Sequence, residues 1–173
     1  MAPSQTVQPM PLTVGVYYPS VTRNYHHRFT YGTNFDIHVG EMTVNFWNSV
    51  FKQAFDKTFL LEESELKTYL GVQHMDGILE VSIKDFSHQY ASGKGYSRRG
   101  ASASLLIEFV LHCPDGEQIA AWLVRGNATM LPKIISPTYK TQLRSPIQSA
   151  SLDAAEQFMS SLPQHFKNTI ECP

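Results

Sequence analysis

Three long segments with strand-like hydrophobic patterns constrain what this chain can fold into. Residues 77–86 (GILEVSIKDF) alternate between apolar and polar side chains, which is typical of a strand with one buried and one wet face. Residues 102–113 (SASLLIEFVLHC) form the strongest strand candidate, and the turn sequence PDGE separates them from residues 118–130 (QIAAWLVRGNATM). The spacing predicts a β-hairpin from the last two segments, within an antiparallel sheet.

Two amphipathic helices are predicted on either side of these strands in the sequence. In residues 40–59 the apolar side chains recur at helical spacing on one wide, aromatic face. These side chains are Phe46, Trp47, Val50, Phe51, Ala54 and Phe55. A second helix is expected over residues 146–162, where Pro146 suits the first turn, after a Pro-containing loop at 131–145.

The order of the elements indicates the fold class. Further strand candidates occur at 12–18, 34–39 and 58–62, and the strands do not alternate strictly with helices. The chain therefore predicts an α+β fold, with a mostly antiparallel four- to five-stranded sheet and two helices packed on one face. Its 173 residues suit a single domain, which we assign to residues 12–173 after a flexible, Pro-, Gln- and Ser-rich tether at 1–11.

Charge and cysteine content limit the function classes. The formal net charge is -1, which argues against nucleic acid as the main partner. No run of 18 apolar residues is present, so no membrane span is predicted. The two cysteines, Cys113 and Cys172, do not have zinc-finger spacing. They could form one disulfide that closes a long loop, or remain two unpaired thiols.

Residues 18–32 (YPSVTRNYHHRFTYG) gather tyrosine, histidine and arginine without a helical pattern. Arg and Tyr are enriched at binding hot spots, and the planar guanidinium of Arg suits carboxylate or phosphate groups. We therefore predict a partner-binding rim made by Arg23, Tyr25, His27 and Arg28. The alternative is a set of partly exposed polar aromatic residues at a loop or strand edge.

A metal site in this region is not expected from the sequence. The adjacent His26 and His27 point to opposite faces if they lie on a strand, so they are poorly placed to bind one metal ion together. A site could use one of them with His38 and a carboxylate such as Asp36, but it would need three or four converging ligands. A histidine-based metal carrier is therefore kept only as a minor alternative, and no cofactor is expected.

A second basic segment joins two of the predicted strands. Residues 92–102 (SGKGYSRRGAS) carry Lys94, Arg98 and Arg99 among three glycines, and they lack the Walker A pattern. The loop is predicted to contact an anionic surface, such as a lipid headgroup or an acidic protein, unless it is simply solvated. No nucleophile-elbow motif is present, so the chain is expected not to be an enzyme.

One family resemblance rests on residues 12–25 (LTVGVYYPSVTRNY), followed by the Phe-rich segment VGEMTVNFWNSVFKQAF and long alternating strands. This order resembles small bacterial envelope lipoproteins, in which a short tether leads into an α+β domain. Similar domains occur in the N-terminal part of the Tol translocation protein, in the curli secretion lipoprotein and in the outer-membrane lipoprotein of lipopolysaccharide transport. The resemblance covers residues 12–162 as an architecture and brings no catalytic motif.

The resemblance implies a periplasmic protein, tethered to the outer membrane by an N-terminal lipid anchor that this chain does not contain. Such a domain would be a non-catalytic accessory or assembly component of an envelope transport or secretion system. Its partner would be an envelope protein or an anionic envelope polymer, and related domains can form homo-oligomers. The alternative is a cytoplasmic small-ligand-binding domain or enzyme, with a pocket between the Phe-rich helix and the sheet. A filled core would favour the first function, and a deep pocket with converging polar groups would favour the second.

Overall fold

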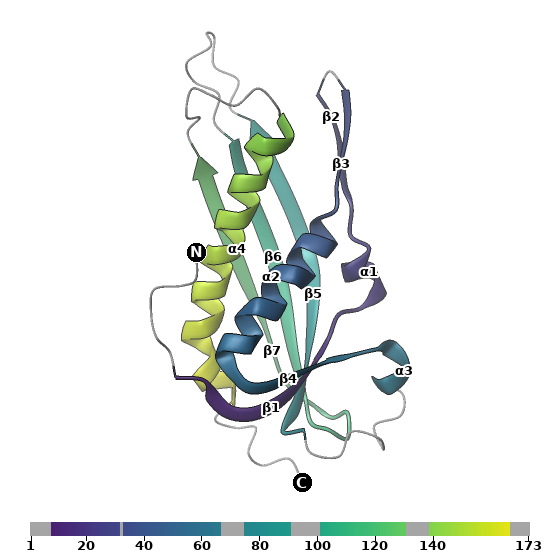
Figure 1. Ribbon diagram of the computed structural model, residues 1–173, viewed down its shortest axis with the longest axis vertical. Coiled ribbons are helices and arrows are strands. Elements are labelled where there is room, and N and C mark those ends of the chain that lie inside the picture. The colour runs from purple at the N-terminus through teal and green to yellow at the C-terminus, as the bar shows by residue number, and fades with distance from the viewer. Residues whose placement is uncertain (1–7, 32, 67–74, 91–100, 131–138, 167–173) are drawn as a thin grey trace.

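The computed structural model describes residues 8–31, 33–66, 75–90, 101–130 and 139–166 (Figure 1). Seven strands and four helices are assigned in these ranges. The strands are β1 Met10–Tyr17, β2 His27–Tyr31, β3 Thr33–Ile37, β4 Phe55–Leu61, β5 Gly77–Tyr90, β6 Ala101–His112 and β7 Gln118–Met130. The helices are α1 Ser20–Arg23, α2 Val39–Ala54, α3 Glu63–Leu66 and α4 Tyr139–Phe166. Strand β1 begins two residues inside the predicted tether.

The main sheet has five strands in the order β4-β1-β5-β6-β7. Strands β5, β6 and β7 are antiparallel neighbours, which confirms the predicted antiparallel segment and its hairpin. Strand β1, however, is parallel to both β4 and β5, so the sheet is mixed and the prediction of a mostly antiparallel sheet is wrong at this edge. After β1 the chain passes through α1, β2, β3 and α2 before it forms β4. This long crossover lets β4 run in the same direction as β1. Its four consecutive buried residues, Val14 to Tyr17, lack the alternation of a strand with one wet face.

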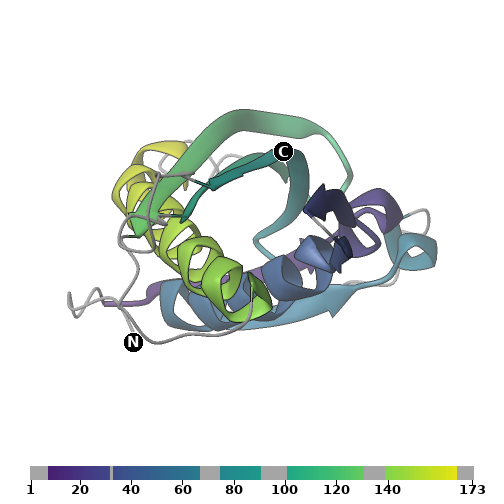
Figure 2. The same ribbon diagram turned by 90° about the horizontal axis from the view of Figure 1, so that it is seen from above.

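Helices α2 and α4 lie on one face of the sheet, as predicted (Figure 2). Helix α4 is longer than expected, because it starts at Tyr139 and carries Pro146 in its interior rather than in its first turn. A proline there removes one helical hydrogen bond, and the burial of Pro146 and Ile147 offsets that cost. No helix in the described part of the chain is long and apolar enough to cross a membrane.

An aromatic core fills the space between these helices and the sheet. Trp47 and Phe51 from α2, Phe109 from β6 and Phe158 from α4 are all 0% exposed. Their ring centroids lie 4.9 Å apart for Trp47 and Phe109, and 4.6 Å apart for Phe109 and Phe158. Helix α4 also approaches β7 closely, since a Cβ atom on Gly126 would lie 1.8 Å from the carbonyl oxygen of Ala150. The four rings therefore contact one another in the centre of the core.

Strands β2 and β3 form a separate antiparallel hairpin beside the far end of β5 (Figure 1). Two contacts fix its base. The backbone N–H of Ile83 in β5 donates to Thr22 Oγ1 at 3.1 Å, and the N–H of Gly40 in α2 donates to the carbonyl oxygen of Tyr25 at 2.9 Å. The hairpin therefore starts and ends on elements that belong to the main body of the domain.

Candidate functional site

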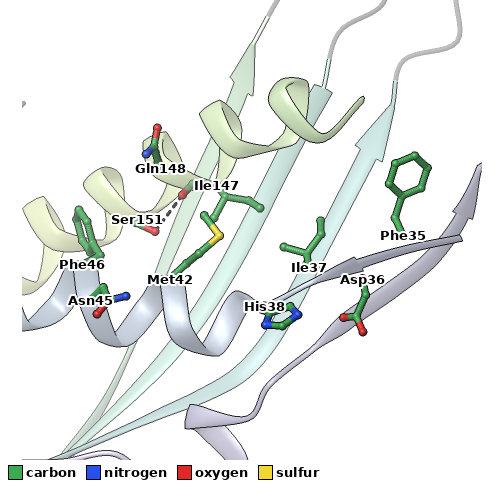
Figure 3. A pocket seen from close by; sticks show the side chains of 10 residues that line it. All are labelled: Phe35, Asp36, Ile37, His38, Met42, Asn45, Phe46, Ile147, Gln148 and Ser151. Carbon is green, nitrogen blue, oxygen red and sulfur yellow. Dashed lines mark hydrogen bonds between the residues drawn. The ribbon is translucent and has the colours of Figure 1, made fainter. Parts of the chain in front are cut away.

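A surface cleft of about 560 Å³ lies between the hairpin and the two long helices (Figure 3). Its lining comes from two parts of the chain that are distant in sequence, residues 35–46 and residues 147–151. The lining residues are Phe35, Asp36, Ile37 and His38 from the end of β3, Met42, Asn45 and Phe46 from α2, and Ile147, Gln148 and Ser151 from α4. The cleft is thus assembled where β3 runs into α2 and α4 passes alongside.

The floor of the cleft is apolar and its rim is polar. Ile37, Met42 and Phe46 are partly buried and pack against the core. Asn45 and Gln148 are exposed and carry side-chain amides that can donate and accept hydrogen bonds. The hydroxyl of Ser151 donates to the carbonyl oxygen of Ile147 at 2.9 Å, so this donor is already used within α4. An apolar group flanked by hydrogen-bonding groups would match this lining.

The outer face of the hairpin carries a cluster of charged and imidazole side chains. Asp36 Oδ1 lies 3.0 Å from His26 Nδ1, and the Nε–H of Arg28 donates to Asp36 Oδ2 at 3.2 Å. The rings of His26 and His38 lie 4.2 Å apart between centroids. Desolvation raises the pKa of the Asp36 carboxyl, but the hydrogen bonds from Arg28 and His26 outweigh it and lower the pKa. Asp36 is therefore a carboxylate at neutral pH.

The inner face of the hairpin packs on β5 through aromatic and imidazole rings. His27 Nε2 lies 2.8 Å from His88 Nδ1, and the rings of Phe29 and Phe35 stack at 5.0 Å. Burial lowers the pKa of His27, although the carboxylate of Asp85 acts in the opposite direction. Burial and the neighbouring His27 both lower the pKa of His88. At pH 7 both imidazoles are consequently mainly neutral in the folded state.

The four residues predicted as one partner-binding rim lie in different environments. Arg28 is on the outer face with a side chain 77% exposed, whereas His27 turns inward to His88. Tyr25 is partly buried and packs against the core. Arg23 pairs with Glu62 at 2.9 Å, at the end of β4. The structure therefore leaves only Arg28 next to the cleft, through its bond to the lining residue Asp36.

Several other predicted site residues lie outside the described ranges. Lys94, Arg98 and Arg99 fall in residues 91–100, and Cys172 falls in residues 167–173. Cys113 is buried and disulfide-bonded. Its pairing with Cys172 stays a prediction because the second cysteine is not described.

Sequence reasoning missed the part of the cleft that comes from α4. Ile147 and Gln148 follow Pro146 in a segment where the sequence predicts only a helix start. Their approach to Ile37 and Met42 depends on tertiary packing over about a hundred residues of chain, which periodicity does not report. The sequence offered Asp36 and His38 together with one of the two adjacent histidines as an alternative, and the structure brings His26 to them.

Among the comparisons with known proteins, only the comparison of folds found similar proteins. No protein-family model matches the sequence, and no curated protein matches it. A neuraminyllactose-binding hemagglutinin homologue from Helicobacter pylori is similar with a TM-score of 0.58 at 9% identity, covering 100% of this chain and 98% of that one. A minor lipoprotein from Acinetobacter baumannii follows at 0.43, with 9% identity and coverage of 90% and 93%. A lipoprotein from Neisseria meningitidis follows at 0.42, with 9% identity and coverage of 91% and 99%. Bacterial lipoproteins are thus among the structures that this chain is similar to, and the first match shows a shared fold.

Proposed function

We propose that this chain is a non-catalytic domain of the bacterial envelope that docks a protein partner at the cleft between its hairpin and helices. The observation that carries the proposal is the contrast between a filled core and an open cleft. The region between the Phe-rich helix and the sheet, where a ligand-binding domain would have its pocket, is occupied by four fully buried aromatic rings. The cleft lies outside these four rings and combines an apolar floor with a polar rim.

The occupant that fits best is a short segment of a protein partner. One or two apolar side chains would cover Met42 and Phe46, while Asn45 and Gln148 would bond to the backbone of the segment. Arg28 and Asp36 would flank the entrance as charged groups. The envelope location is proposed from the sequence resemblance to envelope lipoproteins.

Position-specific photocrosslinking in the native host tests the docking. A photoreactive residue replacing Gln148 is expected to give one discrete adduct with a partner. The matched control replaces Glu156, an exposed residue further along the same helix that does not line the cleft. A Met42→Glu exchange, which places a charge on the floor, is expected to remove the Gln148 adduct, and circular dichroism verifies that the variant is folded. Equal adducts from both positions, or an adduct that survives Met42→Glu, would contradict docking at this cleft.

A separate experiment tests the proposed location in the bacterial envelope. Intact mass of the protein from its own cells is expected to show a lipid-modified N-terminal cysteine, in the outer-membrane fraction. An unmodified chain starting at Met1 in the cytosol would remove the envelope part of the proposal. Oligomeric state can be read from the same material by light scattering.

A small-ligand function is the second candidate, and the volume of the cleft favours it. About 560 Å³ falls within the usual size of small-molecule pockets. Native mass spectrometry of protein purified from its own cells distinguishes the two. A retained small molecule that Met42→Glu displaces would support this candidate, and its absence together with the crosslinked adduct would support protein docking.

A further inference from the structure

We propose that His26, Asp36 and His38 form a binding site for a divalent metal ion of the zinc class. Each of the three offers one ligand atom, and these atoms all lie within 4.8 Å of one another. It is the one such group of three or more potential ligands among the residues that the structure describes. This inference goes beyond the proposed docking function because metal binding needs no partner, although Asp36 and His38 also line the cleft.

The fold holds the three ligands on a defined framework. Asp36 lies in β3 opposite Arg28 of β2, so the strand pairing fixes the face to which it points. Figure 3 shows Asp36 on the opposite side of β3 from Phe35 and Ile37. His38 sits between β3 and α2, and His26 immediately precedes β2. Because the hydrogen bond between Gly40 and Tyr25 closes the base of the hairpin, both histidines are anchored to the domain body.

The donor set matches zinc chemistry. Zinc prefers imidazole nitrogen and carboxylate oxygen, at bond lengths that place neighbouring ligand atoms about 3.3 Å apart in a tetrahedral site. His26 Nδ1 and Asp36 Oδ1 are already 3.0 Å apart, so small side-chain rotations would admit the ion between them. The two aspartate oxygens are divided between two roles, because Arg28 holds Oδ2 at 3.2 Å and leaves Oδ1 for the metal. A hydrogen bond of this kind orients a ligating carboxylate.

A fourth ligand is within reach on the first turn of α2. Glu41 Oε2 lies 3.8 Å from His38 Nδ1, and its side chain is 70% exposed and can therefore rotate toward the site. With Glu41 bound, two carboxylates would neutralise the charge of the ion. Without it, water or a donor group from another molecule would complete the coordination.

The inner histidines provide an internal control. His27 and His88 lie 2.8 Å apart on the opposite face of the hairpin, where they are partly buried and contact aromatic rings. A Zn²⁺ titration of variants in each group can therefore distinguish binding at the outer cluster from nonspecific binding to other histidines.

The experiment is a zinc titration of chelator-stripped, untagged protein in competition with a chromophoric chelator. One equivalent of Zn²⁺ is expected to bind, and His26→Gln, Asp36→Asn and His38→Gln are each expected to weaken binding by about tenfold or more. His88→Gln is expected to leave the affinity unchanged. X-ray absorption at the zinc edge is expected to show two imidazoles in the first shell, and circular dichroism verifies that each variant is folded.

Two outcomes would overturn the site. One is the absence of saturable one-to-one binding to the wild-type chain. The other is wild-type affinity in a folded His26→Gln/His38→Gln double variant, which would place the metal elsewhere. Because the titration uses zinc alone, its failure leaves docking at the cleft untouched, and a failed crosslinking experiment equally leaves the metal site untouched.

Discussion

The helix–sheet core and the hairpin end of this domain use the same kinds of side chain in opposite ways. In the core, Trp47, Phe109 and Phe158 are fully buried and contact one another's rings. At the hairpin end, aromatic and imidazole rings are only partly buried, and charged groups cover the outer face. Burial of large apolar side chains is the main source of stability, whereas exposed, hydrogen-bonding groups are available to other molecules. The core is therefore expected to supply most of the stability, and the hairpin end is the place of the proposed recognition.

The largest expected effect comes from opening the core. Phe158→Ala removes a ring that contacts Trp47, Phe51 and Phe109, and it should lower the free energy of unfolding by about 3–5 kcal/mol. Urea denaturation followed by tryptophan fluorescence measures it. The matched control is Phe59→Ala on β4, where the side chain is 51% exposed and the loss should be well below that of Phe158→Ala. Similar losses of stability in both variants would contradict the conclusion that the buried core supplies most of the stability.

The second-largest effect is expected from a substitution at the close contact between α4 and the sheet. Gly126→Ala would place a methyl group 1.8 Å from the carbonyl oxygen of Ala150, which is backbone and cannot rotate away. The helix must shift outward, and the expected destabilisation is about 1–3 kcal/mol. The thermal midpoint should therefore fall. An unchanged midpoint would mean that the helix can move without cost.

The third effect is a pH dependence confined to the hairpin. The pKa of His88 is lowered from 6.5 by burial and by His27, so the unfolded hairpin binds protons more readily than the folded one. Stability therefore decreases as the pH falls through about 6.5, the unfolded value, and levels off below the folded pKa.

Amide hydrogen exchange at pH 7.5 and pH 5.5, corrected for intrinsic rates, measures this dependence. Strands β2 and β3 should lose protection at the lower pH while β6 keeps its own. His88→Gln should reduce the difference, and His26→Gln on the outer face is the control. Equal loss of protection in the hairpin and in β6 would contradict a local effect.

The smallest effect concerns an exposed ion pair away from the cleft. Arg23→Gln removes the contact with Glu62, and exposed pairs of this kind contribute at most about 1 kcal/mol. Because Arg23 does not lie at the cleft, the exchange should also leave the Gln148 crosslink intact, whereas Arg28→Gln should reduce it. If Arg23→Gln removed the crosslink as well, the recognition surface would be wider than the cleft.

Local sequence pattern was enough to predict α2, β6 and β7. Strand β7 has the bounds expected from its sequence, because PDGE fixes the turn and alternation fixes the faces of β6. The apolar face of α2 is also as predicted, except that Phe55 begins β4 instead of continuing the helix. The direction of β1 was not predicted, although its continuous run of buried residues is typical of a strand in a parallel pair. The candidate site was harder still, since it depends on strand register and on the approach of α4.

The two adjacent histidines show why register matters here. His26 belongs to the outer cluster and His27 to the inner contact with His88, although they are neighbours in the chain. Insertion or deletion of a single residue in β2 would exchange the two faces and disrupt both groups at once, whereas a change of two residues would keep each face intact. Natural length variation in this hairpin is therefore expected to occur in steps of two residues.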